Sequence, residues 1–385
     1  MKYIYSLFLL LSIYTIAPAQ QVDNALLLDY YQNQKYADAY KYLKGIYTEP
    51  ITDMKALANL AYTSRMGGSL ADAESYYLRI YDKDSTNTAI LFNLGNINAG
   101  RGNNVKAITY YKKILLIDST NFSVYKELAS LSQTQLDTLG YGYYLVKANT
   151  INPKEPDVAY DLGRFYLPSK KYNKAEAVLN IAIQADSSNL ILLQGKAEVS
   201  YLEKKYPETI ATCAKLMQSG EKNPYVIQWM ALSYYKTLQY KLALNTFLLL
   251  PNNLQNESSF YYIAMCYKAL DDQPNAIIYM QKAIVDGVSA YVGDYYNEIG
   301  DSQDRLHQVK KASASFQKSL QFKETSLVYY SLANLFDTEL KDKASAIKYY
   351  KKFLASKPDA KEDQKYIEYA TSRIPALGGK LSTVQ

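Results

Sequence analysis

The chain has 385 residues, of which 48% are hydrophobic and 21% charged, a composition that excludes a disordered chain and favours a folded one. Its 43 basic and 37 acidic residues give a net charge of +6 on a mixed surface, whereas a nucleic-acid-binding protein would need a clustered basic patch. Tyrosine is unusually frequent at 41 residues, while 16 glycines and 11 prolines are few for this length, which favours a mostly helical chain.

Residues 1–19 are typical of an export signal. Lys2 gives the positive start, residues 4–16 form a mostly apolar run, and Ala17-Pro18-Ala19 is a small-x-small cleavage site. The run is shorter than the ~20 residues that span a bilayer, and no cysteine follows it, which argues against a lipoprotein. We expect a mature chain that begins at Gln20 and is exported to the periplasm or outer envelope of a Gram-negative bacterium; an uncleaved anchor is the alternative.

Residues 20–358 repeat about every 34 residues, as the related stretches KAITYYKKIL (106–115) and SAIKYYKKFL (345–354) first suggest. A marker alanine identifies most copies: Ala39, Ala73, Ala107, Ala175, Ala243, Ala276, Ala312 and Ala346. Tyr141 and Thr209 fill the two remaining slots. The spacing predicts about ten copies of one structural unit.

Each copy carries further fixed positions around the marker. A small residue stands twelve residues before it in most copies, as in Gly95 and Ala129, and a bulky residue stands four after it, as in Tyr111. Three residues further on, most copies are apolar again, as in Ile114. Spacings of three, four and seven place residues on one helix face. Each copy is therefore predicted to be two antiparallel helices that cross closely at the small residues, with the lysines of KAITYYKKIL facing water.

The turns between these helices also repeat. Within copies, MGG (66–68) and AGRGNN (99–104) are typical turns. Between copies, DSTN (84–87 and 118–121), DSSN (186–189) and NP (152–153) take one slot, and their Asp and Asn side chains are predicted to cap the next helix. Residues 359–385 are predicted to form a capping helix, with Ile367, Ala370 and Ile374 on one side, and a flexible tail beyond Pro375.

The chain resembles the tetratricopeptide repeat family. The resemblance rests on the 34-residue period, the small residues of both helices, the aromatic residue four after the alanine, and the later Pro153 and Pro358. The chain departs from the family pattern at Tyr141 and Thr209, in having a single tryptophan, and in lacking the proline in most copies. The resemblance covers nearly all of residues 20–358. It implies an all-α fold, a right-handed α-solenoid of about ten helix-turn-helix repeats with a C-terminal capping helix.

The sequence holds no recognisable catalytic constellation. Its single histidine, His307, falls in a predicted turn, and no phosphate-binding glycine loop or nucleophile elbow is found. Cys213 and Cys266 are separated by both helices of the intervening copy, which predicts two buried free thiols out of disulfide reach. We therefore expect no enzyme activity, no cofactor and no metal site; a lone carboxylate-pair active site is the alternative that stays open.

In the resembled family, the first helices of the repeats line a concave groove that binds proteins or peptides. Counting from the small position gives the groove candidates Phe92, Asn96, Lys126, Tyr160, Arg164, Tyr201, Tyr225, Gln228, Tyr235, Tyr261 and Lys268, beside Glu198, Met265, Asn297 and Asp301. A tyrosine-lined groove suits extended peptides, because the rings give contact area at low entropy cost. The plain alternative is that these rings cover neighbouring helices. The family's clamp for a C-terminal carboxylate is not expected, since Ala58 and Phe92 stand where its first lysine is required.

The sequence thus predicts an exported scaffold or adaptor that binds a protein or peptide partner, without nucleic acid and without a transmembrane segment in the mature chain. The alternative is a glycan-binding envelope protein whose groove tyrosines stack on sugar rings. A cluster of tyrosine with Asp, Asn and Arg in one shallow pocket would favour that alternative.

Overall fold

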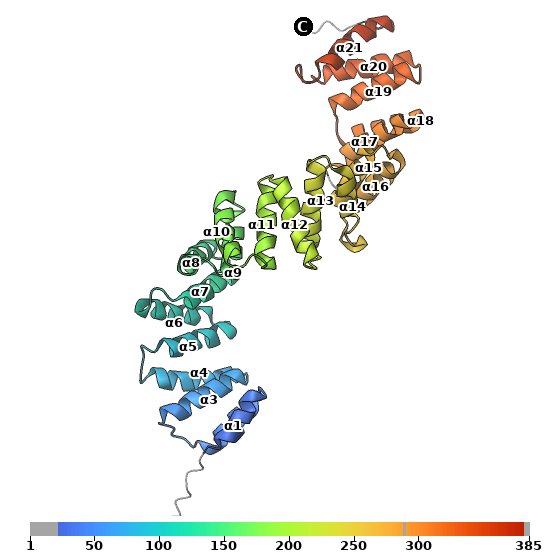
Figure 1. Cartoon of the computed structure of the whole chain (residues 1–385). Helices are drawn as coiled ribbons and strands as arrows, with labels where there is room; N and C mark the ends of the chain where they lie inside the picture. Colours follow the sequence, from blue (N-terminus) through green and yellow to red (C-terminus); the bar gives the residue numbers. More distant parts are fainter. Residues whose placement is uncertain (1–21, 288–289, 381–385) are drawn as a thin grey trace, which may run out of the picture. The chain divides into compact units, whose positions relative to one another are not determined.

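The computed structural model describes residues 22–287 and 290–380. The predicted export signal at 1–19 and the last residues of the predicted tail, 381–385, lie outside this range. The described residues form 21 α-helices and one short 3-10 helix, with no strand among them, and they divide into two compact units, residues up to Val158 and residues from Ala159 (Figure 1). This confirms the all-helical repeat fold.

Unit 1 holds four helix pairs, in which each second helix folds back along the first. Second helices also contact the first helix of the next repeat, as α2 contacts α3 and α4 contacts α5. The helices are α1 (Asn24–Gln32), α2 (Tyr36–Ile46), α3 (Met54–Met66), α4 (Leu70–Tyr81), α5 (Thr88–Gly100), α6 (Asn104–Ile117), α7 (Phe122–Thr134) and α8 (Thr138–Ile151), and the division between the units falls within α9 (Pro156–Tyr166).

Unit 2 continues the same alternation and ends in a single helix that packs on α20. Its elements are α10 (Tyr172–Ala185), α11 (Leu190–Leu202), α12 (Tyr206–Gln218), α13 (Pro224–Lys236), α14 (Tyr240–Phe247), η1 (Asn252–Leu254), α15 (Glu257–Ala269), α16 (Gln273–Asp286), α17 (Val292–Arg305), α18 (Val309–Phe322), α19 (Ser326–Thr338), α20 (Lys343–Ala355) and α21 (Gln364–Ala376). One helix departs from the others in length: α14 has 8 residues and is followed by η1.

One residue in the turn of every helix pair has a positive φ angle, in the left-handed region. These residues mark the repeat independently of the alanines. These residues are Gln34, Gly68, Gly102, Leu136, Lys170, Lys204, Leu238, Asp271, His307 and Lys341. They keep the marker spacing through the two copies that lack the alanine. Glycine adopts this conformation without strain, whereas the other side chains adopt it at a cost of ~1 kcal/mol or more. The turns are therefore imposed by packing of the helices rather than by turn residues alone.

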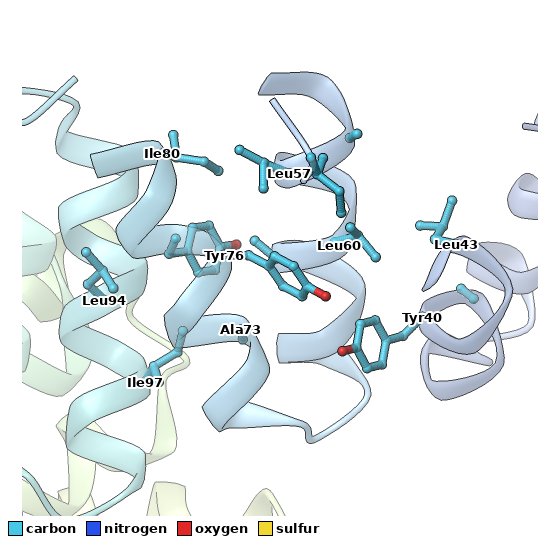
Figure 2. Close-up of a cluster of buried hydrophobic side chains, with 14 of the residues drawn as sticks. Tyr40, Leu43, Leu57, Leu60, Ala73, Tyr76, Ile80, Leu94 and Ile97 are labelled. Atoms are coloured by element: carbon cyan, nitrogen blue, oxygen red, sulfur yellow. The ribbon is translucent and has the colours of Figure 1, made fainter. Parts of the chain in front are cut away.

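The predicted core positions are buried as expected. The marker alanines from Ala39 to Ala346 are all within 3% of complete burial, and Tyr111 and Tyr350, which occupy the bulky position, are fully buried. Figure 2 shows how side chains from α2, α3, α4 and α5, among them Leu57 and Tyr76, meet in one cluster of unit 1. At Gly95 an added Cβ would stand 2.5 Å from the Tyr111 ring, so the small first-helix residue is what lets the two helices cross.

The departures from the repeat pattern have local explanations. Thr209 replaces the marker alanine and is fully buried, with its hydroxyl 3.0 Å from Ser200 Oγ on the facing helix. Tyr141 is half-buried and flanked by Gly140 and the buried Gly142, which supply the small residues of that copy. The expectation that the lysines of KAITYYKKIL face water is wrong for Lys113, whose ammonium group donates a hydrogen bond of 2.7 Å to the Tyr81 hydroxyl of the preceding repeat.

The DSTN and DSSN turns cap helices as predicted. In each one the final asparagine is the N-cap residue: Asn87, Asn121 and Asn189 accept hydrogen bonds from backbone N–H groups of α5, α7 and α11. The aspartates that open these turns accept from the following Thr or Ser side chain and backbone, and these hydrogen bonds hold the pKa of Asp84 and Asp186 below the usual value.

The capping helix α21 is attached by an ion pair between a buried carboxylate and a partly exposed arginine. Ala370 and Ile374 are fully buried against α20, as the sequence predicts, while Ile367 is partly buried in the same cluster. Arg373 donates to both carboxylate oxygens of Asp337 on α19, at 2.6 and 2.9 Å, and the Asp337 side chain is only 2% exposed. Tyr350, which is in α20, donates to the same carboxylate at 3.4 Å. The last repeat is therefore closed by charge as well as by apolar packing.

Candidate functional site

The first helices of unit 2 form a continuous wall of tyrosine rings. We call the exposed side of α11, α13, α15 and α17 the first-helix wall; α11 contacts α13, and α13 contacts α15. Tyr235 and Tyr262 have ring centroids 5.0 Å apart, Tyr261 and Tyr262 5.2 Å, and Tyr261 and Tyr295 5.4 Å. Tyr201 packs in the same cluster as Tyr235 and Tyr262. The repeat register therefore brings tyrosines from four helices together.

These phenols stay neutral. Burial raises the pKa of Tyr201, Tyr235 and Tyr261, and nearby phenol or carboxyl groups raise each of them further. A neutral phenol offers an apolar ring, a hydrogen-bond donor and an acceptor in one side chain. The wall can thus make both apolar and hydrogen-bonded contacts with a bound molecule.

A cleft of about 650 Å³ opens in this wall between α15 and α17. We call it the α15–α17 cleft; it is lined by Glu257, Ser258, Tyr261, Tyr262, Tyr291, Asp294, Tyr295, Asn297 and Glu298. The Tyr295 hydroxyl donates a hydrogen bond of 2.6 Å to Glu257 across the two helices. The cleft combines aromatic rings with carboxylates, a lining that fits an extended polar segment better than an apolar ligand.

Lys268 pairs with Glu298, a lining residue of the α15–α17 cleft, but does not line the cleft itself. Its ammonium nitrogen lies 2.5 Å from Glu298 Oε2 and 2.6 Å from Asp301 Oδ2, both on α17, and its side chain is 13% exposed. The sequence predicts Lys268 as a binding residue, whereas the structure shows it bridging two successive repeats.

A second, smaller cleft of about 280 Å³ contains two of the predicted residues. Tyr225 and Gln228 on α13 line it together with Pro224, Leu250, Leu254, Asn256 and Ser259. Its opposite side is formed by the chain around η1, because α14 ends early at Phe247. Tyr225 is 63% exposed, so its ring is available on this surface. The irregular repeat therefore forms part of this cleft.

The remaining candidates make contacts between or within repeats. Asn96 accepts a hydrogen bond of 2.5 Å from the buried Tyr111 hydroxyl, and the Phe92 ring lies 5.7 Å from the Tyr111 ring. Lys126 pairs with Glu155 at 3.1 Å and with Asp157 at 3.7 Å. These residues stabilise the array of unit 1.

Arg164 and Tyr160 play a comparable role at the start of unit 2. Arg164 Nε lies 3.5 Å from Glu198 on the next first helix, and its guanidinium group lies 5.7 Å from the centroid of the Tyr160 ring. Of the predicted groove residues, the structure thus brings Tyr201, Tyr235 and Tyr261 into one row of rings, and Tyr261 and Asn297 line the α15–α17 cleft, whereas Tyr160 and Arg164 do not.

The sequence prediction missed seven of the nine residues that line the α15–α17 cleft: Glu257, Ser258, Tyr262, Tyr291, Asp294, Tyr295 and Glu298. Tyr262 and Glu298 each stand two residues before the small position of their helix, and Asp294 stands six before it. The groove candidates are taken from positions that begin three residues before the small residue of each first helix. Counting one further helical turn back, as the period of 3.6 allows, would have found Asp294.

The other chemically interesting side chains form no site. His307 is exposed at the left-handed turn position, and Cys213 and Cys266 are buried free thiols whose pKa values burial raises to about 12. No group of three or more metal-ligating side chains occurs within residues 22–287 and 290–380. Over the same residues, no helix is both long and apolar enough to cross a membrane.

Comparison with known proteins finds two family-model matches and several similar solved structures. Residues 258–286 and residues 327–359 each match a family model described as tetratricopeptide repeat. A tetratricopeptide repeat protein from Parabacteroides merdae has a similar structure, with 18% sequence identity and a TM-score of 0.43, over 65% of this chain and 98% of that one. The C-terminal part of a repeat-containing protein from Cytophaga hutchinsonii aligns over 68% of this chain and 94% of its own, with 16% identity and a TM-score of 0.46. No curated protein matches the sequence.

Proposed function

We propose, for a chain that belongs to the tetratricopeptide repeat family, that it is a non-enzymatic scaffold which binds an extended segment of a partner protein on the first-helix wall of unit 2. Tetratricopeptide repeats generally act as scaffolds for protein–protein interaction. The observation that carries the proposal is the α15–α17 cleft, where tyrosines and hydrogen-bonding side chains line about 650 Å³ of open space.

The chemistry of the wall supports a peptide-like ligand. Tyrosine loses little side-chain entropy on binding and contributes large contact area, so a row of tyrosines can hold an extended chain. Ser258 and Asn297 at the cleft can exchange hydrogen bonds with a peptide backbone. A partner held by these contacts would span successive first helices.

We place this scaffold in the cell envelope, as residues 1–19 suggest. An exported chain would act in the periplasm or on the outer envelope of a Gram-negative bacterium. The test is the mass of the mature protein from its native host. A chain that begins at Gln20 is expected, and a full-length chain recovered from the cytoplasm would contradict the proposal.

Glycan binding is a second candidate, favoured by one observation. Tyr261 and the exposed Tyr291 share the α15–α17 cleft with Asp294 and Asn297, and such a combination can stack on a sugar ring while bonding its hydroxyls. No arginine lines this cleft among the described residues, so the cluster that would favour a glycan is present only in part.

Capture from an envelope extract discriminates between the two. The purified chain is expected to retain one protein, and Ser258→Arg, which fills the α15–α17 cleft, is expected to abolish retention. Ser123→Arg is the matched control, because Ser123 is exposed at the same register position of α7, six residues before the small residue. Retention on polysaccharide without any protein partner, lost in Ser258→Arg, would replace the protein-binding proposal by the glycan one.

A further inference from the structure

One face of α17 is a row of carboxylates. Asp294, Glu298 and Asp301 are separated by four and three residues, a spacing that places them on the same side of a helix. The C-terminal part of this row already holds an ammonium group, that of Lys268, through Glu298 and Asp301 at 2.5 and 2.6 Å. The row is therefore built to bind a cation that reaches it from the side of α15.

The N-terminal part of the row meets no such cation from α15. At this level α15 contributes Glu257, Ser258, Tyr261 and Tyr262 to the α15–α17 cleft, and none of the described lining residues is a lysine or arginine. Asp294 is paired with Lys323 at 3.1 Å, and both side chains are about half exposed, so water screens this pair. The lining thus carries three carboxylates beside four tyrosine rings.

The local charge differs in sign from that of the whole chain. The chain carries a net charge of +6, whereas the side chains that line the α15–α17 cleft are acidic or neutral, and Lys268 and Lys323 pair with two of the three carboxylates from outside the lining. Burial raises the pKa of the Tyr261 hydroxyl, and the negative charges of Glu298 and Asp294 raise it further. A cationic ligand is therefore expected to prefer this cleft to the average surface.

We infer that the α15–α17 cleft binds a lysine or arginine side chain of the partner segment, between the tyrosine rings and the carboxylates of Asp294 and Glu298. The inference rests on the proposed function and specifies its ligand. An ammonium or guanidinium group gains from a ring face within about 6 Å and from a nearby carboxylate, and the two gains act on the same charge. A partner segment with a basic residue is therefore selected over an acidic one.

Titration calorimetry with hexalysine on the full chain tests this inference. Binding is expected at low salt, with an affinity that falls about tenfold when salt rises from about 0.05 to 0.5 M, because screening shortens the reach of the carboxylates. Asp294→Asn combined with Glu298→Gln is expected to weaken binding at least about fivefold, since it removes charge and keeps shape and hydrogen-bonding capacity. Tyr261→Leu is expected to weaken it about threefold by removing a ring.

Glu127→Gln is the matched control. Glu127 stands two residues before the small position of α7, as Glu298 does in α17, and it lies in unit 1. It is expected to leave hexalysine binding unchanged, and circular dichroism of every variant checks that the helices persist.

Three results would overturn the inference: no binding of hexalysine, equal loss in Glu127→Gln, or binding of hexaglutamate or a neutral hexasaccharide that depends on Asp294 and Glu298. Failure of the inference is distinct from failure of the proposed function. If hexalysine does not bind while Ser258→Arg still abolishes capture of a protein, only the cationic ligand is wrong; if Ser258→Arg has no effect on capture, the groove proposal itself fails.

Discussion

The two units share one frame but use their first helices differently. In unit 1 the predicted groove residues are occupied: Asn96 holds the hydroxyl of a core tyrosine, and Lys126 pairs with Glu155 and Asp157 of the next repeat. In unit 2 Tyr261, at the register position of Lys126, lies with Tyr235 in a wall that has an open cleft. A repeat fixes where a side chain lies, and the neighbouring copies decide whether it is available for a partner.

Truncating a buried core residue should destabilise the helix pairs of both units equally. Tyr111→Ala in unit 1 and Tyr350→Ala in unit 2 each empty a fully buried position, and each is expected to cost ~3–5 kcal/mol of local stability. Hydrogen exchange of the affected repeat measures this, because repeats open locally. Tyr143→Ala on the exposed side of α8 should change exchange little. A large cost in only one unit would show that the frames differ.

Helix α21 should detach from the last repeat of unit 2 at acid pH. Arg373 holds the pKa of Asp337 below its usual value, so this carboxylate stabilises the native state above the unfolded pKa near 4 and loses that effect as pH falls through the lower native pKa. Asp337→Ala should cost ~1–3 kcal/mol, because the buried Tyr350 hydroxyl also loses its acceptor.

Exchange of α21 amides between about pH 5 and 2 measures this effect. The native chain should lose protection of α21 before that of α15, and Asp337→Asn should show a flatter pH dependence. Identical pH profiles for the two helices would contradict the role of the ion pair.

Lys126 in unit 1 and Lys268 in unit 2 each pair with carboxylates of the next repeat, so their removal compares the two units. Lys268→Met removes a nearly buried ammonium from two carboxylates and should cost ~1–2 kcal/mol, whereas Lys126→Met breaks a more exposed pair and should cost less than ~1 kcal/mol. Melting of each variant at low and high salt checks this. A larger cost at Lys126 would mean that unit 1 depends more on its charges than burial indicates.

The smallest expected effect is a gain in stability at the turns. Leu136 in unit 1 and Leu238 in unit 2 are exposed in the left-handed conformation, so Leu136→Gly and Leu238→Gly should each stabilise by ~0.5–1 kcal/mol, as relief of strain exceeds the added entropy of the unfolded chain. Gly102→Ala, at the same turn position, should destabilise by a similar amount. Destabilisation by Leu136→Gly would show that its side chain is needed for packing.

The sequence was sufficient for the frame because the frame depends on local spacing. The marker alanines, the bulky positions and the Asn87 and Asn121 caps all follow from residues within one copy. It was insufficient for the site, since availability depends on side chains from the second helix of the same copy and from the neighbouring copy. Nothing in the first helix alone shows that Tyr111 reaches Asn96, or that Glu298 meets Lys268 from α15.

The most direct test of the account is photo-crosslinking in the native host from two equivalent serines. A photoreactive residue at Ser258 lies in the α15–α17 cleft, and one at Ser123 occupies the same exposed register position in unit 1. The account predicts that a protein becomes attached at position 258 and none at position 123. Attachment of the same protein at both positions, or at position 123 alone, would contradict the assignment of partner binding to the first-helix wall of unit 2.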